Sequence, residues 1–410
     1  MSKKENAMKR LYQSILATDL KETDKMLFLA GPRQVGKTTL AKDTKNLTSH
    51  FHYLNWDNDD NKKLILQGPK SIVEKFQLDI PTNKKPILVF DEIHKYVRWK
   101  NFIKGFFDTY RSLTHVIVTG SAKLHLYQKG GDSMAGRYFL YRIHPLSVRE
   151  CIHSKPNLDS EISLPKKISD KDFEHLLKYS GYPEPFLKHN LRFYNRWQNL
   201  LDQQLFREDI RDISKTHDLV HLELLAEILQ HQTGQLINAS NLSTKIHYSY
   251  HTVNKWLSIL TQVYYCFLVQ PWTKNVNKSL SKQPKVYLWN WTRVLDEGKQ
   301  AENFIAAHLL KAVHFWTDIG LGEYKLHFIR DRDKNEVDFL VVKNKKPWFL
   351  VEVKLSSSQP ISKNLIKFQE KLGVKHAFQV VLDKDYEEIN CFNYERPIIV
   401  PAKTFLSQLV

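Results

Sequence analysis

The sequence predicts an α/β fold that begins with a parallel sheet covered by helices on both faces. Three observations support this prediction. Short apolar runs alternate with helix-like stretches over residues 1 to about 150, an order typical of parallel sheets and their crossover connections. The first apolar run leads into a loop that contains two glycines. A later run ends in two acids, Asp91 and Glu92.

Five short strands are expected in this part of the chain, and helices separate most of them. Ligands of such sheets bind where the strands end. The glycine loop, the two acids and Ser121 all fall at these strand ends. The expected strands are Met26–Ala30, Phe51–Leu54, Ile87–Asp91, His115–Thr119 and Tyr138–Tyr141, with helices from about Lys37, over Ser71–Leu78 and over Trp99–Thr109.

The loop after the first strand has the pattern GxxxxGK[ST], between an expected strand and an expected helix. Backbone N–H groups of such a loop surround phosphate oxygens, and the helix N-terminus adds partial positive charge. The pattern predicts that Lys37 contacts the β- and γ-phosphates of a nucleoside triphosphate and that the Thr38 hydroxyl binds Mg²⁺. The loop residues are Gly31, Pro32, Arg33, Gln34, Val35, Gly36, Lys37 and Thr38.

Further polar residues at the strand ends complete a hydrolytic site. We expect Asp91 to hold the Mg²⁺ and Glu92 to polarise the attacking water, the alternative being a solvated strand end. Ser121 is expected to sense the γ-phosphate, the alternative being a turn residue after Gly120. Arg137 is a candidate for stabilising charge on the transferring phosphoryl group, the alternative being a surface arginine.

The composition is that of an ordinary globular chain with a strong positive charge. A length of 410 residues allows two or three domains. The net charge of +17 favours nucleic acid as a partner and an anionic membrane surface second, unless it reflects a generally Lys-rich proteome. No apolar run approaches a transmembrane length, and the N-terminus lacks a signal-peptide pattern. Three distant cysteines argue against disulfides or structural zinc and fit a cytoplasmic location.

The middle of the chain is less regular. Residues 156–170 resemble a loop, and the basic-aromatic stretch Arg192–Trp197 is expected to be the amphipathic face of a helix or a nucleic-acid contact. Residues 221–290 predict three helices followed by two strands, the order of a winged helix. His251, Asn254 and Lys255 on its third helix would then face a DNA groove. The alternative is a domain used only for packing.

A second cluster of acids is expected in residues 291–410. Asp338 lies on one strand of an expected hairpin, Glu352 and Lys354 lie two residues apart on the other strand, and Glu302 lies on a preceding helix. Three carboxylates and a lysine of this kind would bind Mg²⁺ or Mn²⁺ and position a water for phosphodiester attack, as in a PD-(D/E)xK nuclease core. The alternatives are a solvent-facing charge pair and a catalytically silent remnant.

Together these segments resemble the prokaryotic AAA+-type P-loop ATPases whose C-terminal domain of unknown function ends in a restriction-endonuclease-like module. Two departures are Asn290, where Asp is common, and Ser180-Gly181 in place of a glycine pair. The resemblance implies a P-loop ATPase domain over 1–155, a helical linker over 156–220, a winged-helix-like domain over 221–290 and a nuclease-like α/β domain over 291–410. It rests on the glycine loop with Thr39 added, Val89–His94, Thr119–Ser121, Gly136–Arg137, Pro145–Ser147, Gly181–Glu184, Glu302–Phe304, Glu336–Phe339 and Glu352–Lys354.

We therefore expect a protein that binds ATP and Mg²⁺, hydrolyses ATP, and couples this to a C-terminal part that binds DNA or resembles a nuclease. The alternative is an ATP-driven switch or regulatory protein whose C-terminal module is catalytically inactive and binds DNA or protein. In a third hypothesis the basic surface serves a membrane or a host factor. A homo-oligomer is compatible with all three, with Arg137 acting in its own subunit or in a neighbour.

Overall fold

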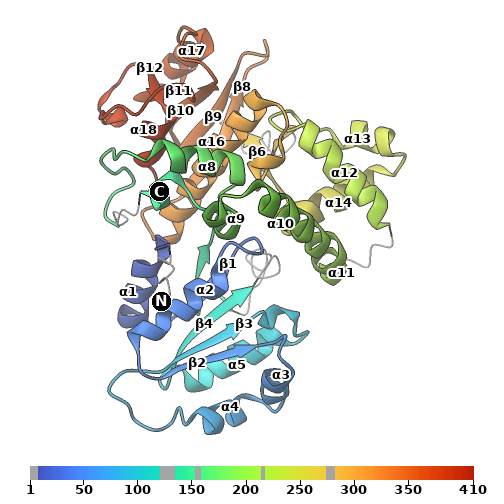
Figure 1. Cartoon of the computed structure of the whole chain (residues 1–410), viewed down its shortest axis with the longest axis vertical. Helices are drawn as coiled ribbons and strands as arrows, with labels where there is room; N and C mark the ends of the chain where they lie inside the picture. The colour runs from blue at the N-terminus through green and yellow to red at the C-terminus, as the bar shows by residue number, and fades with distance from the viewer. Residues whose placement is uncertain (1–7, 121–133, 153–157, 214–217, 274–281) are drawn as a thin grey trace. The chain divides into compact units, whose positions relative to one another are not determined.

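The computed structural model describes residues 8–120, 134–152, 158–213, 218–273 and 282–410. The chain divides into two compact units, Lys9–His144 and Pro145–Val410 (Figure 1). Each unit has its own sheet.

The unit Lys9–His144 is built on a five-stranded sheet in the order β2-β3-β4-β1-β5, with every neighbouring pair parallel. The expected strands are confirmed, and β1 and β3 are buried along their whole length, as continuous apolar runs require in a sheet covered on both faces. The strands are β1 (Met26–Ala30), β2 (Phe51–Asn55), β3 (Ile87–Asp91), β4 (His115–Gly120) and β5 (Tyr138–Arg142).

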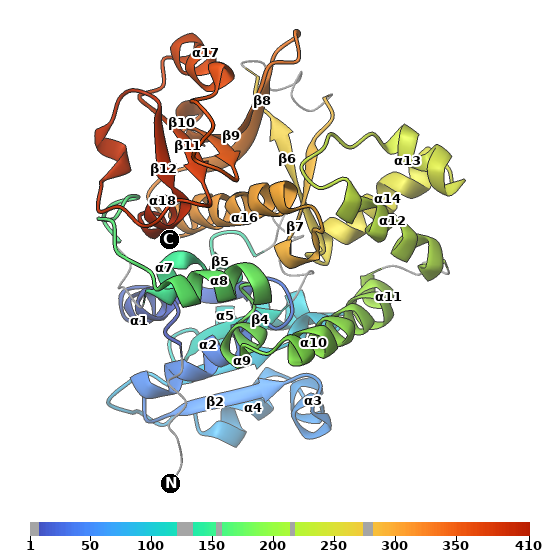
Figure 2. The same ribbon diagram turned by 45° about the horizontal axis from the view of Figure 1, so that its top comes forward.

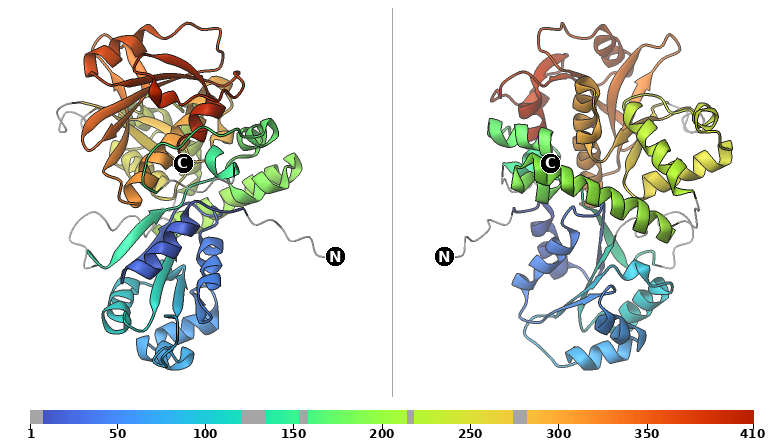
Figure 3. Two further views of the ribbon diagram at one scale, coloured as in Figure 1. Left: turned by 90° about the vertical axis from the view of Figure 1, so that its left-hand side faces the viewer. Right: turned by 45° about the vertical axis from the view of Figure 1, so that its right-hand side comes forward.

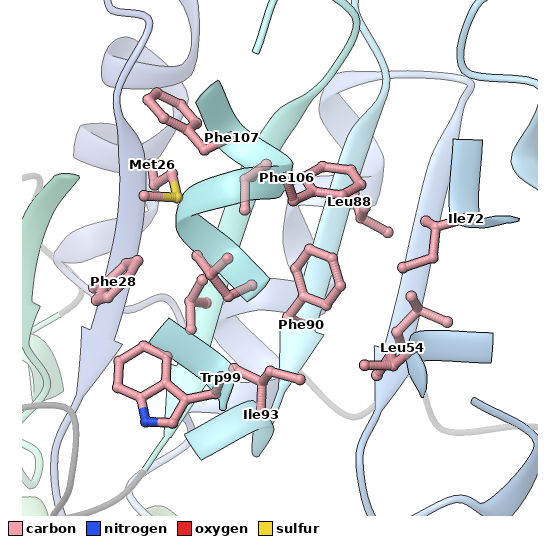
Figure 4. Close-up of a cluster of buried hydrophobic side chains, with 14 of the residues drawn as sticks. Met26, Phe28, Leu54, Ile72, Leu88, Phe90, Ile93, Trp99, Phe106 and Phe107 are labelled. Atoms are coloured by element: carbon pink, nitrogen blue, oxygen red, sulfur yellow. The ribbon is translucent and has the colours of Figure 1, made fainter. Parts of the chain in front are cut away.

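Helices cover both faces of this sheet. The helix α5 packs its apolar side on one face, where Phe90 lies edge-on to Phe106 with ring centroids 5.5 Å apart (Figure 4). On the other face, α2 contacts β1, β3 and β4. The helices are α1 (Tyr12–Glu22), α2 (Lys37–Asp43), α3 (Asp59–Leu66), α4 (Pro69–Phe76) and α5 (Trp99–Tyr110), with short 3-10 turns at Thr44–Leu47 and Ile93–Lys95.

The unit Pro145–Val410 contains a seven-stranded mixed sheet in the order β12-β11-β10-β9-β8-β6-β7. The expected hairpin is the antiparallel pair β9–β10. Beyond it, β10 pairs in parallel with β11, and β11 pairs in parallel with β12. The strands are β6 (Cys266–Pro271), β7 (Lys285–Leu288), β8 (Tyr324–Arg330), β9 (Glu336–Lys343), β10 (Lys346–Lys354), β11 (His376–Val381) and β12 (Ile398–Pro401).

Helices pack on this sheet, and three more lie beside its strands β6 and β7. The helix α16 contacts β7, β8, β9 and β10, while α17 contacts β9, β10 and β11 (Figure 2). Three further helices, α12, α13 and α14, lie together beside β6 and β7 (Figure 3). The α-helices are α7 (Val148–Cys151), α8 (Asp170–Tyr179), α9 (Pro183–Lys188), α10 (Leu191–Gln204), α11 (Ile210–Ile213), α12 (Leu219–His231), α13 (Ala239–Ile246), α14 (Tyr250–Gln262), α16 (Glu297–Asp318), α17 (Lys363–Leu372) and α18 (Ala402–Ser407).

Two boundaries between the parts of the chain are bridged by contacts. The first compact unit ends at His144, and Lys311 on α16 donates to the Pro145 carbonyl at 2.9 Å and to Ser147 Oγ at 3.1 Å. The sheet also continues across the expected limit at residue 290, because β6 pairs with β7 on one side and with β8 on the other. Among the described residues, no helix combines the length and apolarity needed to cross a membrane.

Candidate functional site

The glycine loop lies between β1 and α2, as the sequence predicts. A Cβ at Gly31 would come within 2.2 Å of the Ile143 carbonyl oxygen, because the backbone after β5 passes directly beside the loop. Gly36 immediately precedes α2 with φ +93°, in the left-handed region that favours glycine. The two glycines therefore allow a tight backbone that brings the loop to the start of the helix.

Lys37 is the first residue of α2, and its side chain lies over the loop. Only 6% of the residue is exposed, and its ammonium donates to the carbonyl oxygens of Gly31 at 3.0 Å and Pro32 at 2.6 Å. The charge is therefore held at the loop itself, beside the backbone groups that would surround a phosphate.

Asp91 ends β3 and accepts hydrogen bonds from hydroxyls on three neighbouring elements. Thr38 Oγ1 on α2 lies 3.2 Å from Asp91 Oδ1 and 3.0 Å from Oδ2. Tyr53 on β2 and Thr119 on β4 also donate to the Asp91 carboxylate. Burial and the hydrogen bond to Asp91 raise the pKa of the Tyr53 hydroxyl. These contacts fix the carboxylate beside the loop.

Glu92 follows directly and has a left-handed backbone with φ +56°. Its Oε2 lies 3.7 Å from His94 Nε2 and 3.9 Å from Lys95 Nζ. Burial raises the pKa of the Glu92 carboxyl, while the charges of Lys37, Lys95 and Arg33 act in the opposite direction. Glu92 is thus a largely enclosed carboxylate within electrostatic reach of the loop lysine.

Sequence reasoning assigned no role to three residues that support this site. Arg10 donates to the Val35 carbonyl inside the loop and to the His144 carbonyl, which links the loop to the segment after β5. Thr119 lies one residue before the carboxyl end of β4, so the strand-end rule could have identified it, whereas Tyr53 is the middle residue of β2 and gives no such signal. Nothing in the local sequence indicates Arg10, because its partners lie far along the chain.

The structure places Arg137 at the N-terminal end of the strands, away from the loop. Arg137 precedes β5, and its carbonyl accepts a hydrogen bond from the N–H of Met26, the first residue of β1. The loop follows the C-terminal end of β1, whereas Arg137 lies beside its N-terminal end, so within one unit the two lie at opposite ends of these parallel strands. The Arg137 guanidinium contacts Asp108 on α5, with distances of 2.7 and 3.0 Å. Ser121 lies outside the described residues.

A second cluster of charges forms around β7, α16, β9 and β10. Lys285 Nζ lies 2.7 Å from Glu336 Oε1, 3.2 Å from Glu302 Oε1 and 3.7 Å from Asp338 Oδ1. The Tyr287 hydroxyl donates to Glu302 at 2.6 Å. The structure therefore brings Glu302 and Asp338 to one buried ammonium that the sequence did not indicate.

Glu352 and Lys354 border this cluster. Lys354 Nζ donates to Glu352 Oε1 at 2.8 Å, and the backbone N–H of Val353 donates to Asp338 Oδ2 at 2.9 Å. Glu352 Oε2 is buried without a hydrogen-bond partner in the described part of the chain. Burial, followed by the charge of Asp338, raises the pKa values of Glu302 and Glu352 to about 7. Within the described ranges, no three Asp, Glu, His or Cys side chains are grouped so that they could hold a metal ion.

Comparisons with known proteins agree with the order of these parts. Residues 23–152 match the family model of an AAA domain. Residues 170–291 and 297–404 match two domains of unknown function, DUF8612 and DUF4143.

Two uncharacterized proteins are similar to most of this chain. An uncharacterized protein of Haemophilus influenzae is 23% identical over 357 residues, which cover 84% of each chain. An uncharacterized protein of Mycobacterium tuberculosis is 19% identical over 359 residues, covering 83% of this chain and 72% of that one. The solved structure of AMPPCP-bound DnaA from Aquifex aeolicus is 12% identical with a TM-score of 0.32, covering 62% of this chain and 88% of that one.

The parallel sheet, the loop and the family match together define the unit Lys9–His144 as an AAA-type P-loop domain. This is the class of domain that binds nucleoside triphosphates, and the prediction of such a domain from the sequence is confirmed. The two following segments carry family matches without an assigned activity.

Proposed function

We propose that this chain is a Mg²⁺-dependent ATPase whose nucleotide site lies at the loop Gly31–Thr38. The observation that carries the proposal is the contact of the Thr38 hydroxyl with the Asp91 carboxylate at 3.0–3.2 Å, one residue before Glu92. A hydroxyl and a carboxylate are the oxygen donors that Mg²⁺ prefers beside phosphates. The donor set fits this ion, which Thr38 and Asp91 would hold and which would neutralise phosphate charge.

Lys37 would bind the β- and γ-phosphates. Its ammonium donates to two neutral carbonyls in the loop, and phosphate oxygens are stronger acceptors because they are charged. The loop N–H groups and the start of α2 would bind the remaining phosphate oxygens. Glu92 would accept a hydrogen bond from the attacking water and orient it toward the γ-phosphate.

The other predicted contacts complete this proposal. Arg33, Gln34, Val35 and Thr39 belong to the loop or to the first turn of α2, within reach of a nucleotide held there. Ser121 remains a proposed γ-phosphate contact. Arg137 would act on a neighbouring subunit of a homo-oligomer, because the glycine loop of its own subunit lies at the opposite end of the strands.

The ATPase proposal is tested by comparing wild-type turnover with Lys37→Ala and Glu92→Gln, with and without single- and double-stranded DNA. Both variants are expected to lose turnover. Lys70→Ala is a matched control, because Lys70 lies on α4 and its side chain is 83% exposed. Normal turnover by Lys37→Ala would refute the nucleotide site.

For the C-terminal unit we propose a role in binding DNA or a protein without cutting, so that the whole chain acts as an ATP-driven switch. Cleavage would require a divalent cation bound by Glu302, Asp338 and Glu352. The observation that favours the non-cutting role is the ammonium of Lys285, which lies 3.2 Å from Glu302 and 3.7 Å from Asp338. The net charge of +17 supports DNA as the partner, with the helices α12–α14 as a winged-helix-like reader.

A nuclease remains the second candidate, supported by the convergence of Asp338, Glu352 and Lys354 on neighbouring strands. Incubating the protein with DNA and Mn²⁺ distinguishes the two. Wild-type cleavage that disappears in Asp338→Asn would establish the nuclease and refute the non-cutting role. DNA binding that weakens steeply with salt would support a nucleic-acid partner over a membrane or a host protein.

A further inference from the structure

A buried lysine lies among three carboxylates of the C-terminal unit. Lys285 is 3% exposed, and its ammonium is 2.7 Å from Glu336, 3.2 Å from Glu302 and 3.7 Å from Asp338. We infer that this ammonium takes the place of a divalent cation, so that the cluster carries its own cation and binds Mg²⁺ or Mn²⁺ only when Lys285 is removed. The inference deepens the proposed non-cutting role and rests on it.

The ammonium fills the space between the carboxylates, where a cation that replaced it would lie. A divalent cation bound by these carboxylates would lie about 2.0–2.6 Å from their oxygens. The favourable position for any cation is the point between the three acids, and Lys285 Nζ lies there. An ammonium and a metal ion cannot share this point, because their positive charges would repel each other at short distance.

The backbone around Lys285 is held on both sides. On one side β7 pairs with β6, with Lys285 opposite Val269. On the other side the segment between α12 and α13 contacts β7, since the N–H of Gly234 donates to the Val286 carbonyl at 2.9 Å and Lys285 forms a bridge with Leu236. Lys285 therefore belongs to a fixed strand within the sheet and is a resident part of the cluster.

Gly234 also explains how the cluster is enclosed. A Cβ at Gly234 would lie 3.1–3.2 Å from the two carboxylate oxygens of Glu302, and its φ is +75°. The backbone of this segment therefore packs directly against the carboxylate. With the Tyr287 hydroxyl on the same carboxylate, Glu302 is held toward Lys285.

The charge balance of the cluster predicts what removal of the lysine does. Counted with every carboxyl group ionised, four carboxylates face three cationic groups when Lys285 is present. Without Lys285, four face two, a formal difference of 4 − 2 = 2 negative charges, which a divalent cation would neutralise. The acids are Glu302, Glu336, Asp338 and Glu352, and the bases are Lys285, Lys354 and Arg330.

Lys354 provides a matched comparison within the same cluster. Its ammonium donates to Glu352 at 2.8 Å, and its side chain is 30% exposed against 4% for Lys285. Lys354→Ala removes the same amount of charge as Lys285→Ala but leaves the point between Glu302, Glu336 and Asp338 occupied. A gain of metal affinity confined to Lys285→Ala would therefore depend on position, and charge alone would not explain it.

The test is Mn²⁺ binding to the full-length protein without nucleotide, measured by calorimetry and by the electron paramagnetic resonance signal of free Mn²⁺. We expect wild type and Lys354→Ala to show no Mn²⁺ site that depends on Asp338. Lys285→Ala should bind one Mn²⁺ per chain with a gain in affinity of about tenfold or more. The double variant Lys285→Ala with Asp338→Asn should lose this gain, and circular dichroism should verify the folding of each variant.

Several outcomes would overturn the inference. One is wild-type Mn²⁺ binding that is lost in Asp338→Asn, a comparison that remains informative even if Lys285→Ala does not fold. Another is a folded Lys285→Ala that binds no Mn²⁺. A third is an equal gain in Lys354→Ala. Wild-type Mn²⁺ binding without DNA cleavage would refute only the role of Lys285, whereas cleavage would refute the proposed non-cutting function.

Discussion

The Thr38 hydroxyl and the Asp91 carboxylate lie in direct contact, with distances of 3.2 and 3.0 Å from Thr38 Oγ1 to the two carboxylate oxygens. Thr38 belongs to α2 and Asp91 to the end of β3, so the contact joins the loop helix to the centre of the sheet. If both residues hold Mg²⁺, Thr38→Ala should weaken the apparent Mg²⁺ affinity of ATP turnover by about 10–100-fold, as the loss of metal-site support does elsewhere.

Mg²⁺ titrations of the steady-state ATPase rate measure this effect. Thr38→Ser keeps the hydroxyl and is the matched control, and we expect it to stay within a few-fold of wild type. An unchanged Mg²⁺ dependence in Thr38→Ala would remove Thr38 from the metal site.

Glu92→Gln should separate nucleotide binding from hydrolysis. The amide preserves the size of the side chain but cannot take up a proton, so turnover should fall by about 10²–10⁴-fold, the range typical of a lost general base. Binding of a fluorescent ATP analogue should stay near wild type, because the phosphate contacts come from the loop. Phosphate release and analogue binding provide the two measurements.

The exposed acid Glu74 on α4 supplies the control for the Glu92→Gln variant. Its side chain is 64% exposed, and its carboxylate lies 3.6 Å from the exposed ammonium of Lys70. Glu74→Gln should change neither quantity. Wild-type turnover in Glu92→Gln would show that another group orients the water.

The N-terminal sheet could be predicted from sequence because its strands are short, continuous apolar runs. β1 and β3 are buried at every position, so each appears in the sequence as an uninterrupted hydrophobic segment. The helix α3 was missed because its segment Asp59–Leu66 is mostly polar, and within it only Ile65 is buried. Because a single side chain of α3 is buried, its sequence lacks the hydrophobic periodicity that would predict a helix.

The second cluster could be predicted only in part. Asp338, Glu352 and Lys354 belong to a hairpin with a recognisable pattern, and the pairing of β9 with β10 follows from it. Lys285 gave no signal, because a single lysine in a four-residue strand is ordinary in sequence. Its meaning depends on the pairing of β7 with β6 and on a helix whose Glu302 lies 17 residues further along the chain.

Arg137 should act between subunits if it contributes to hydrolysis. Arg137→Ala is then expected to reduce turnover by about 10³-fold or more, the effect of a lost arginine in related chemistry. Because each subunit would supply the arginine to its neighbour, a mixture of Arg137→Ala and Lys37→Ala chains should recover part of the activity that each lacks alone. Turnover of the mixture at a fixed total concentration measures this recovery.

Asp108→Ala tests whether the ion pair with Arg137 is required. The pair is partly exposed, so it contributes little to stability, and we expect near-normal turnover from this variant. Full activity of Arg137→Ala would show that Arg137 is a surface arginine without a role in hydrolysis.

His308 should make the C-terminal unit less stable in acid. Burial lowers the pKa of this histidine to about 3, and its ring accepts from the N–H of Val148 and contacts the Phe304 carbonyl. The charged groups near it are Lys311, which lowers the pKa further, and Glu150, which raises it. The imidazole is therefore neutral in the folded protein.

The sign follows from the two pKa values. An unfolded histidine has a pKa near 6.5 and takes up a proton below that pH, while the folded one does not until about pH 3. The contribution of His308 to stability is therefore complete above pH 6.5 and is lost as the pH falls, at up to about 1.4 kcal/mol per pH unit. Urea denaturation between pH 5 and 7 should show a shallower pH dependence for His308→Gln than for wild type, and equal slopes would contradict this assignment.

Gly31 and Gly105 should respond oppositely to the same substitution. A Cβ at Gly31 would lie 2.2 Å from the Ile143 carbonyl oxygen, and the Ile143 N–H in turn donates to Ala30 at 2.7 Å, so the neighbouring backbone cannot move without breaking the edge of the sheet. Gly31→Ala should therefore cost about 1–3 kcal/mol or more and weaken nucleotide binding. At Gly105, within α5, a Cβ would meet nothing within 4 Å, so Gly105→Ala should stabilise the unit by about 0.5–1 kcal/mol through its helix propensity. Thermal melts of the two variants beside wild type measure both changes, and a Gly31→Ala protein as stable as wild type would show that the loop has more room than this geometry allows.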